Sequence, residues 1–166
     1  MRTTIRIIAA VAAALATLSG TLTHADSHAE SAQAADAPTV LITGANRGLG
    51  LEFARQYAAD GWKVVGTARV PEQADELSAL SVEVARLDVA HQASVDALAK
   101  SLEGRPIDLL INNAGIFPRV NKIEEVNFDD YSRTIAVNTL GPVRVTRALL
   151  PNLRRGDKKT IVNITS

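Results

Sequence analysis

The sequence predicts an α/β fold with a doubly wound parallel sheet, covered by helices on both faces. From Pro38 onward, short apolar runs alternate with segments of helical periodicity. The first apolar run, 39–43, is continuous rather than alternating, which is typical of a strand buried on both faces. Crossovers of helical length between the runs favour parallel pairing, and we expect the strand order 3-2-1-4-5.

The predicted elements follow one another along the chain. Gly61 should end the first helix, and Pro142 should kink the last one near Val137–Asn138, because proline cannot donate to residue 138. No internal repeat appears beyond this alternation. We expect strands at 39–43, 63–68, 82–87, 107–112 and 160–165, and helices at 48–60, 72–80, 92–102 and from 128 to about 150.

Composition excludes several classes of function. The chain has 18 basic and 18 acidic residues, so charge gives no reason to expect nucleic acid or an anionic membrane as a partner. It has no cysteine, which excludes disulfides, thiolate metal sites and a cysteine nucleophile. His24 and His28 lack a third ligand, and we predict no metal site. The basic residues between Arg144 and Lys159 are interpreted as the solvated face of a helix and the following turn.

The first 25 residues predict a secretory signal. Arg2 and Arg6 flank the start of an apolar run, 7–18, which is too short for a stable membrane span. Small residues that suit cleavage follow, ending at Ala25 or at Ala34. Residues 26–37 have no periodicity and are predicted to be a linker. We expect an exported protein, periplasmic or secreted, if the signal functions, and a cytoplasmic one otherwise.

A glycine-rich turn gives the clearest functional signal. The sequence TGANRGLG directly follows the first predicted strand and opens the first predicted helix. In such a turn one glycine allows the sharp bend, another lets backbone N–H groups approach a pyrophosphate, and a third lets helix and strand pack closely. The spacing is GxxxGxG rather than GxGxxG. The residues predicted to bind a dinucleotide here are Thr43, Gly44, Asn46, Arg47, Gly48, Leu49 and Gly50.

From this turn onward the chain resembles the short-chain dehydrogenases/reductases, a family with the Rossmann fold. The resemblance covers residues 38–166 and includes TGANRGLG, NNAG at 112–115, and the serine strand that ends at Ser166. It also includes Asp88 in LDV and Asn138 in VNT. GANRGLGLE, LLINNAGI and AVNTLGP are most similar to the sniffer-like or C-factor-like carbonyl reductases.

The resemblance implies roles for these residues. Asp88 and Val89 would contact the adenine, with the Asp88 carboxylate accepting from the amino group; the alternative is that Asp88 caps the helix that follows. Asn112 and Asn113 would tie the fourth strand to its neighbours, while Ala114 and Gly115 pass close to the nicotinamide ribose. Two catalytic roles are also implied, a relay water held by Asn138 and a substrate oxygen bound by Ser166; a solvated asparagine and a polar strand end are the alternatives.

Charge at the end of the second strand favours NADP(H) over NAD(H). An NAD enzyme of this fold has a carboxylate there that accepts from the ribose hydroxyls. This chain has Arg69 instead, and Arg47 lies in the glycine turn. A guanidinium can form a fork around a 2′-phosphate.

One part of the family pattern is not in the sequence. The resemblance implies a YxxxK pair on a helix after the fifth strand, and the sequence ends before that helix. Tyr57 and Tyr131 are followed four residues later by Gly61 and Ile135. We therefore expect these residues to be the N-terminal portion of an oxidoreductase that transfers hydride between the nicotinamide and a small carbonyl or alcohol substrate. The alternatives are a dinucleotide-binding module without catalysis and an interaction protein that kept the fold. The family also includes homo-oligomers, for which the sequence gives no support.

Overall fold

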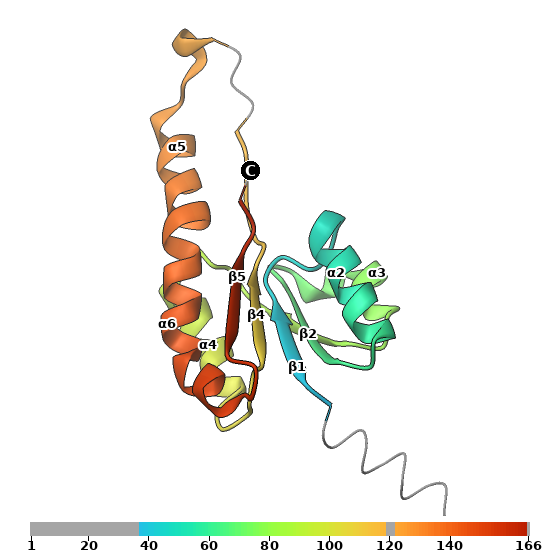
Figure 1. Cartoon of the computed structure of the whole chain (residues 1–166). Helices are drawn as coiled ribbons and strands as arrows, with labels where there is room; N and C mark the ends of the chain where they lie inside the picture. Colours follow the sequence, from blue (N-terminus) through green and yellow to red (C-terminus); the bar gives the residue numbers. More distant parts are fainter. Residues whose placement is uncertain (1–36, 119–121, 166) are drawn as a thin grey trace, which may run out of the picture. The chain divides into compact units, whose positions relative to one another are not determined.

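The computed structural model describes residues 37–118 and 122–165. The predicted signal, the linker up to residue 36, His24, His28 and Ser166 lie outside these ranges. The strands are β1 (Thr39–Ile42), β2 (Lys63–Ala68), β3 (Glu83–Arg86), β4 (Leu109–Asn112) and β5 (Thr160–Asn163). They form one parallel sheet in the order β3-β2-β1-β4-β5, which confirms the predicted order. The carboxyl ends of the strands lie at its upper edge in Figure 1.

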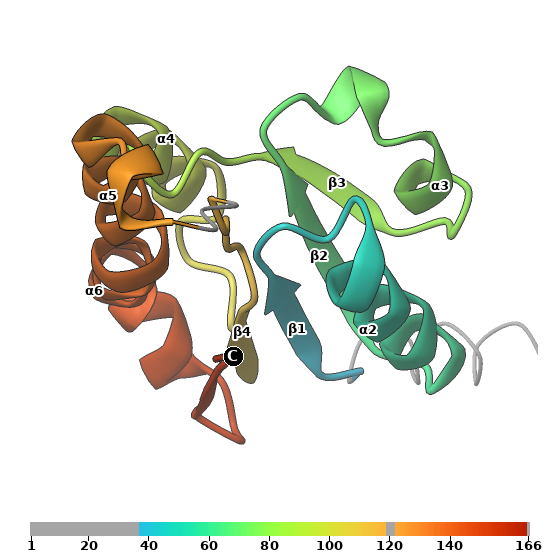
Figure 2. The same cartoon turned by 90° about the horizontal axis from the view of Figure 1, so that it is seen from above.

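Helices cover both faces of the sheet (Figure 2). On one face lie α2 (Gly48–Ala59), the 3-10 turn η1 (Pro71–Gln73) and α3 (Asp75–Ser78). On the other lie α4 (Gln92–Ser101) and α6 (Leu140–Arg155). The π-helical turn η3 (Ile135–Thr139) and α5 (Phe128–Thr134) precede α6, and α5 extends beyond the upper edge of the sheet in Figure 1. A short 3-10 turn, η2 (Ile123–Glu125), precedes α5. No helix in the described ranges is long and apolar enough to cross a membrane.

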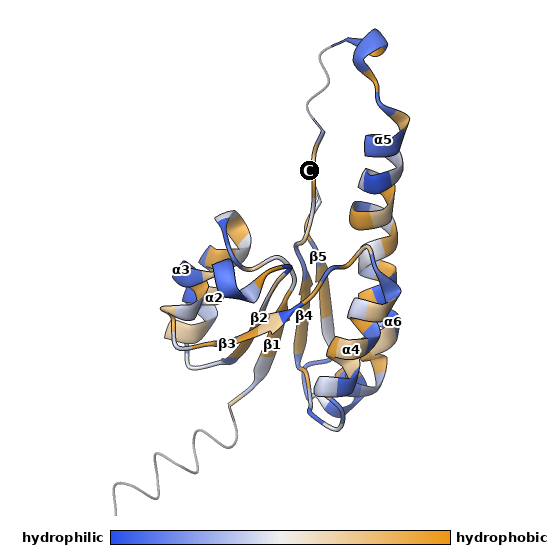
Figure 3. Ribbon diagram, turned by 180° about the vertical axis from the view of Figure 1, so that it is seen from behind, coloured by the Kyte–Doolittle hydropathy of each residue, from blue (hydrophilic) through white to orange (hydrophobic). Residues whose placement is uncertain are grey.

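Two apolar layers hold the sheet between the helices. Leu41 and Leu110 face α4 and α6, where they pack with residues such as Val145 and Leu149. The residues that alternate with them face α2 and α3; Ile42, for example, packs with Leu77. All residues of β1 and β4 are buried, as expected for central strands, whereas β5 is exposed along its length. The hydrophobic colour of the central strands in Figure 3 follows this burial.

The helix predicted at 72–80 is wrong in form. Ala74 has φ −103° and ψ 48°, and its N–H bonds to the carbonyl of Pro71, three residues back, so the chain leaves the helical path between η1 and α3. The reason is tertiary packing. Leu77 is fully buried against Gly66 of β2, where an added Cβ would lie 2.9 Å from the Leu77 methyls. Bringing Leu77 onto the sheet outweighs the weak local preference for one continuous helix.

The last helix differs from the sequence prediction near two prolines, Pro142 and Pro151. The disturbance near Val137–Asn138 takes the form of η3, in which the Leu140 N–H bonds to the carbonyl of Ile135, five residues back. In Figure 1 α5 and α6 follow one another as one helical column. The predicted end near residue 150 is wrong, because α6 continues through Pro151 to Arg155. Buried Asn152 holds this last turn by donating to the carbonyls of Leu102 and Arg105 at 2.6 and 2.8 Å.

Candidate functional site

The glycine turn between β1 and α2 has a different steric requirement at each glycine. Gly44 and Gly48 have φ of +66° and +58°, a region that favours glycine. A Cβ on Gly44 would lie 3.0 Å from Cα of Ala114, whereas one on Gly48 would have no described atom within 4 Å. A Cβ on Gly50 would lie 2.4 Å from the Gly44 carbonyl oxygen. Gly50 therefore allows close packing, and Gly48 leaves open space at the start of α2.

The end of β4 is bound directly to this turn. The hydroxyl of Thr43 accepts from the backbone N–H groups of Asn113 and Ala114, both at 2.9 Å. The Asn113 side-chain amide donates to the carbonyls of Thr43 and Gly44, both at 3.0 Å. Polar groups from residues about 70 apart thus fix the carboxyl ends of the two central strands to each other. This is the point at which the strand order reverses, where ligands bind in doubly wound sheets.

The first turn of α2 presents unused donors at this point. The N–H groups of Gly48, Leu49 and Gly50 donate to no described residue, and Arg47 caps the helix without a side-chain bond. Those N–H groups and the helix dipole give the region a positive potential. By contrast, the N–H groups of Gly44 and Ala45 are already bound to Thr67. Asn46, which is half-buried, lies in the sequence between these bound N–H groups and the unused ones of the helix. The opening of the helix is therefore suited to an anion.

Two arginines follow neighbouring strands at the same edge, Arg47 in the turn after β1 and Arg69 directly after β2. Arg47 and Arg69 are exposed, and neither side chain forms a hydrogen bond or an ion pair with a described residue. Sequence reasoning missed a third arginine, Arg86, at the end of β3. Its guanidinium donates to the Arg69 carbonyl at 2.9 Å and to both carboxylate oxygens of Glu72, at 2.7 and 2.9 Å. Arg86 thereby engages the first carboxylate that follows β2, a pairing between residues 14 apart.

Asp88 follows β3 at the same edge of the sheet. One carboxylate oxygen accepts from the Ala90 N–H at 3.0 Å, and the other lies 3.1 Å from Nδ1 of His91. The residue before α4 is His91, so the alternative in which Asp88 caps that helix is wrong. The Asp88 side chain instead closes the turn that leads from β3 to α4.

Asn138, in η3, binds the segment that follows β4. Its Oδ1 accepts from the Ile116 N–H at 2.9 Å, and its Nδ2 donates to the Ile116 carbonyl at 2.8 Å. Gly115 lies beside the same side chain, since a Cβ there would be 3.7 Å from Oδ1 of Asn138. The side chain is exposed, but both of its polar atoms are hydrogen-bonded to the backbone, which contradicts the alternative of a simply solvated asparagine.

Asn112 joins β4 to β5 and α6. Its Nδ2 donates to Oδ1 of Asn163 at 2.9 Å and to the hydroxyl of Thr146 at 3.3 Å. Its Oδ1 is buried and has no partner among the described residues. The predicted site residues therefore come together at one edge, from the segments that follow β1, β2, β3 and β4 and, for Asn138, from η3. Among them Ser166 alone lies outside the described residues.

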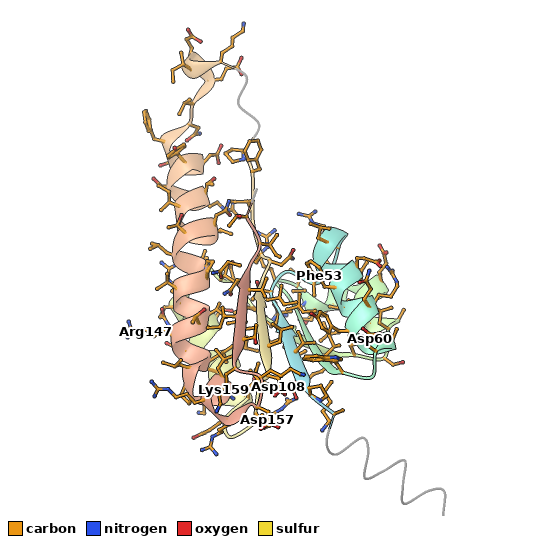
Figure 4. All side chains as sticks on the ribbon, in the orientation of Figure 1. Phe53, Asp60, Asp108, Arg147, Asp157 and Lys159 are labelled. Carbon is orange, nitrogen blue, oxygen red and sulfur yellow. The ribbon has the colours of Figure 1, made fainter. Side chains whose placement is uncertain are left out.

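A hollow of about 400 Å³ lies at the opposite, amino edge of the sheet, bounded by Thr39, Asp108 and Lys158 among others. Asp108 is buried there, and it accepts from the N–H groups of Thr39, Asp157 and Lys158 at 2.8, 2.7 and 3.3 Å. Figure 4 shows Asp108 beside Asp157 at the base of the sheet. Burial acts to raise the pKa of Asp108, but the three N–H donors and the Lys158 charge lower it below its ordinary value. With its carboxylate bonded into the fold, this edge is structural.

The parallel sheet, the strand order and the glycine turn at the reversal point define a doubly wound nucleotide-binding fold. Comparison with known proteins gives the family. The model of the short chain dehydrogenases matches residues 38–166. This chain belongs to the short-chain dehydrogenase/reductase family.

Several relatives are similar over most of this chain. The NADP-dependent 3-hydroxy acid dehydrogenase YdfG of Salmonella typhi is 35% identical over 133 residues, covering 76% of this chain and 53% of the relative. The NADPH-bound carbonyl reductase from chicken fatty liver is 37% identical, with a TM-score of 0.66 over 72% of this chain and 52% of that one. A short-chain dehydrogenase from Streptomyces avermitilis is 36% identical, with a TM-score of 0.70 over 79% and 50%. The chain spans about half the length of the curated relatives it matches.

Proposed function

We propose that this chain binds NADP(H) and belongs to an oxidoreductase that transfers hydride between the nicotinamide and a small carbonyl or alcohol substrate. The observation that carries the proposal is the opening of α2. There, three N–H groups without described partners lie next to the open space at Gly48, and two exposed arginines lie at the same edge. These groups fit a dinucleotide that carries an additional phosphate.

Each part of the site would have a separate task. The N–H groups of Gly48, Leu49 and Gly50 would bind the pyrophosphate, with the helix dipole favouring its charge. Arg47 and Arg69 would bind the 2′-phosphate, where an NAD enzyme would need a carboxylate. Asp88 and Val89 would border the adenine, and Ala114 and Gly115 the nicotinamide ribose. When bound, the cofactor supplies or accepts the hydride.

The residues on the far side of β4 would orient the substrate end. Asn138 uses both polar atoms of its amide to fix Ile116, so it would hold the segment from Ala114 to Ile116 in place. Each amide atom can form a second hydrogen bond, which leaves capacity for the water that the family resemblance implies. Ser166 would bind the substrate oxygen. Within the family, we propose that the chain belongs with the carbonyl reductases.

The test compares the two cofactors on one arginine variant. Arg69→Ala should weaken NADPH binding by roughly 1–3 kcal/mol, the range for hydrogen bonds to a charged group, and should leave NADH binding nearly unchanged. Fluorescence titration of the reduced nicotinamide measures both affinities. Arg147→Ala is the matched control, because Arg147 is exposed and has no described partner. Equal weakening of both cofactors would contradict the proposal, as would wild-type protein that binds neither.

A further inference from the structure

Arg144 joins the helical column to the chain between β3 and α4. Its Nη1 donates to the carbonyl of Ala136 in η3 at 2.9 Å and to the carbonyl of Val89 at 3.4 Å. The side chain is half-buried, so water competes only in part for these bonds. One guanidinium thus connects two segments that are separated by 55 and 8 residues from it along the chain. Figure 2 shows the segment after β3 crossing from the sheet to the helix layer.

Val89 is held from two sides, by the apolar core in which its side chain is buried and by the bond from Arg144 to its carbonyl. The turn at Asp88 is closed by its own bonds, from the N–H groups of Ala90 and His91 back to Asp88. None of these bonds attaches the turn to α6. Apolar packing attaches the side chain of Val89 to the helical column, closest at Gly141, where an added Cβ would lie 2.9 Å from Cγ2 of Val89. Among the described residues the polar attachment of the Val89 backbone to α6 is the Arg144 bond.

The same stretch of helix also holds the segment after β4, through Asn138 and Ile116. Residues 136–144 therefore contact both segments that border the crevice on this side, the one after β3 and the one after β4. Because η3 is wider than an α-helical turn, its carbonyls depart from the regular pattern of partners. The bond from the charged Arg144 side chain to the carbonyl of Ala136, at 2.9 Å, stabilises this turn.

We propose that Arg144 is a positioning residue of the cofactor site. It holds the Asp88–Val89 segment against η3, and so sets the distance between the adenine side of the site and the segment after β4. The identity of the ligand rests on the proposed function. Arg144 itself touches neither cofactor nor substrate in this proposal, since both of its bonds go to backbone carbonyls.

The test uses the full chain and three variants. Arg144→Met removes the donors and keeps most of the apolar stem, while Arg144→Lys keeps the charge and a donor. Arg147→Met is the matched control from the same helix, where the side chain points away from the sheet (Figure 4) and has no described partner. Hydrogen exchange at the amides of Ala90 and His91 measures how the turn is held, without any cofactor. Titrations with NADPH and with 2′,5′-ADP, the adenine half alone, measure binding.

In Arg144→Met we expect exchange at Ala90 and His91 to be about tenfold faster, and both ligands to bind about fivefold more weakly, the scale of losing one hydrogen bond. Arg144→Lys should recover part of both effects, and Arg147→Met should show neither. If Arg144→Met does not fold, as judged by thermal unfolding, the comparison of Arg144→Lys with Arg147→Met decides.

Unchanged exchange in a folded Arg144→Met would overturn the proposal. So would faster exchange with ligand affinities equal to those of Arg147→Met, since the turn would then be irrelevant to binding. If the wild-type protein binds neither ligand, the proposed function is refuted instead. The exchange measurements need no ligand, so they still show whether Arg144 holds the turn.

Discussion

Gly50 and Gly48 lie two residues apart, but replacing each by alanine should have different consequences. At Gly50 the new Cβ would lie 2.4 Å from the Gly44 oxygen and 2.5 Å from Nδ2 of Asn113. Neither neighbour can move freely, because Gly44 is in the turn and Asn113 donates to the carbonyls of Thr43 and Gly44. At Gly48 the space is open, and only the positive φ of +58° opposes alanine.

The magnitudes follow from these contacts. Overpacking at Gly50 should cost about 1–3 kcal/mol, and weakening the two Asn113 bonds about 0.5–1.5 kcal/mol each. The better helix propensity of alanine returns about 1 kcal/mol, so Gly50→Ala should lose about 1–5 kcal/mol of unfolding free energy, with about 3 kcal/mol as the central value. Gly48→Ala should lose about 1–2 kcal/mol, the cost of the left-handed conformation. Its added methyl group nevertheless occupies the space where the proposed pyrophosphate would approach.

Chemical denaturation followed by circular dichroism measures both stabilities, and NADPH titration measures binding. We expect Gly50→Ala to be the less stable variant, and Gly48→Ala to lose at least about tenfold in NADPH affinity while it remains folded. A Gly50→Ala protein within about 0.5 kcal/mol of wild type would refute the reasoning about close packing. Wild-type NADPH affinity in Gly48→Ala would refute the proposed approach of the cofactor to this turn.

Three further predictions concern other parts of the chain. Asp108→Ala leaves the buried Thr39 N–H without its acceptor and should cost about 1–3 kcal/mol in urea unfolding. The pKa of Asp108 is lowered in the folded state, so the stability that the carboxylate contributes is complete above the unfolded pKa of about 3.9 and is lost as pH falls through the folded pKa. The difference in unfolding free energy between wild type and Asp108→Ala should therefore shrink on acidification. Arg86→Met frees the Glu72 carboxylate beside Arg69, and should lower NADPH affinity several-fold relative to NADH; an unchanged ratio of the two affinities argues against this role. If the chain is exported, mass spectrometry should find a mature N-terminus near Asp26 or Ala35, and an intact Met1 on cytosolic protein would contradict the predicted signal.

The sequence predicts the order of the sheet because each strand carries its own local signal. Continuous apolar runs at β1 and β4 indicate burial on both faces, and the glycine turn fixes which strand comes first. Helix ends are less predictable where distant residues determine them. Pro151 is a valid local reason to end a helix, but the bonds from Asn152 to Leu102 and Arg105 extend α6 past it.

The same distinction applies to the site. TGANRGLG and NNAG are contiguous in sequence, so their residue types and spacing indicate a nucleotide turn directly. The partners of Arg86 and Arg144 cannot be read in this way, since Glu72 and Val89 lie 14 and 55 residues from them. Both arginines resemble ordinary solvated charges in the sequence, which is why the pattern around Arg144 indicates a solvated helix face. Their bonds to fixed backbone carbonyls appear only when the fold brings these segments together.

The pairing of β1 with β4 has a consequence for the folding pathway. Thr43 and Asn113 are 70 residues apart, and both β2 and β3 are placed on the other side of β1 before the chain returns to form β4. Contacts of such large separation form slowly, because loop-closure entropy opposes them until much of the structure exists. We therefore expect the crevice between these strands to form late, after β1, β2 and α2 have come together. The anion-binding turn would be nearly complete in a partly folded chain, whereas a site bounded by both strands would exist only once the central pair had closed.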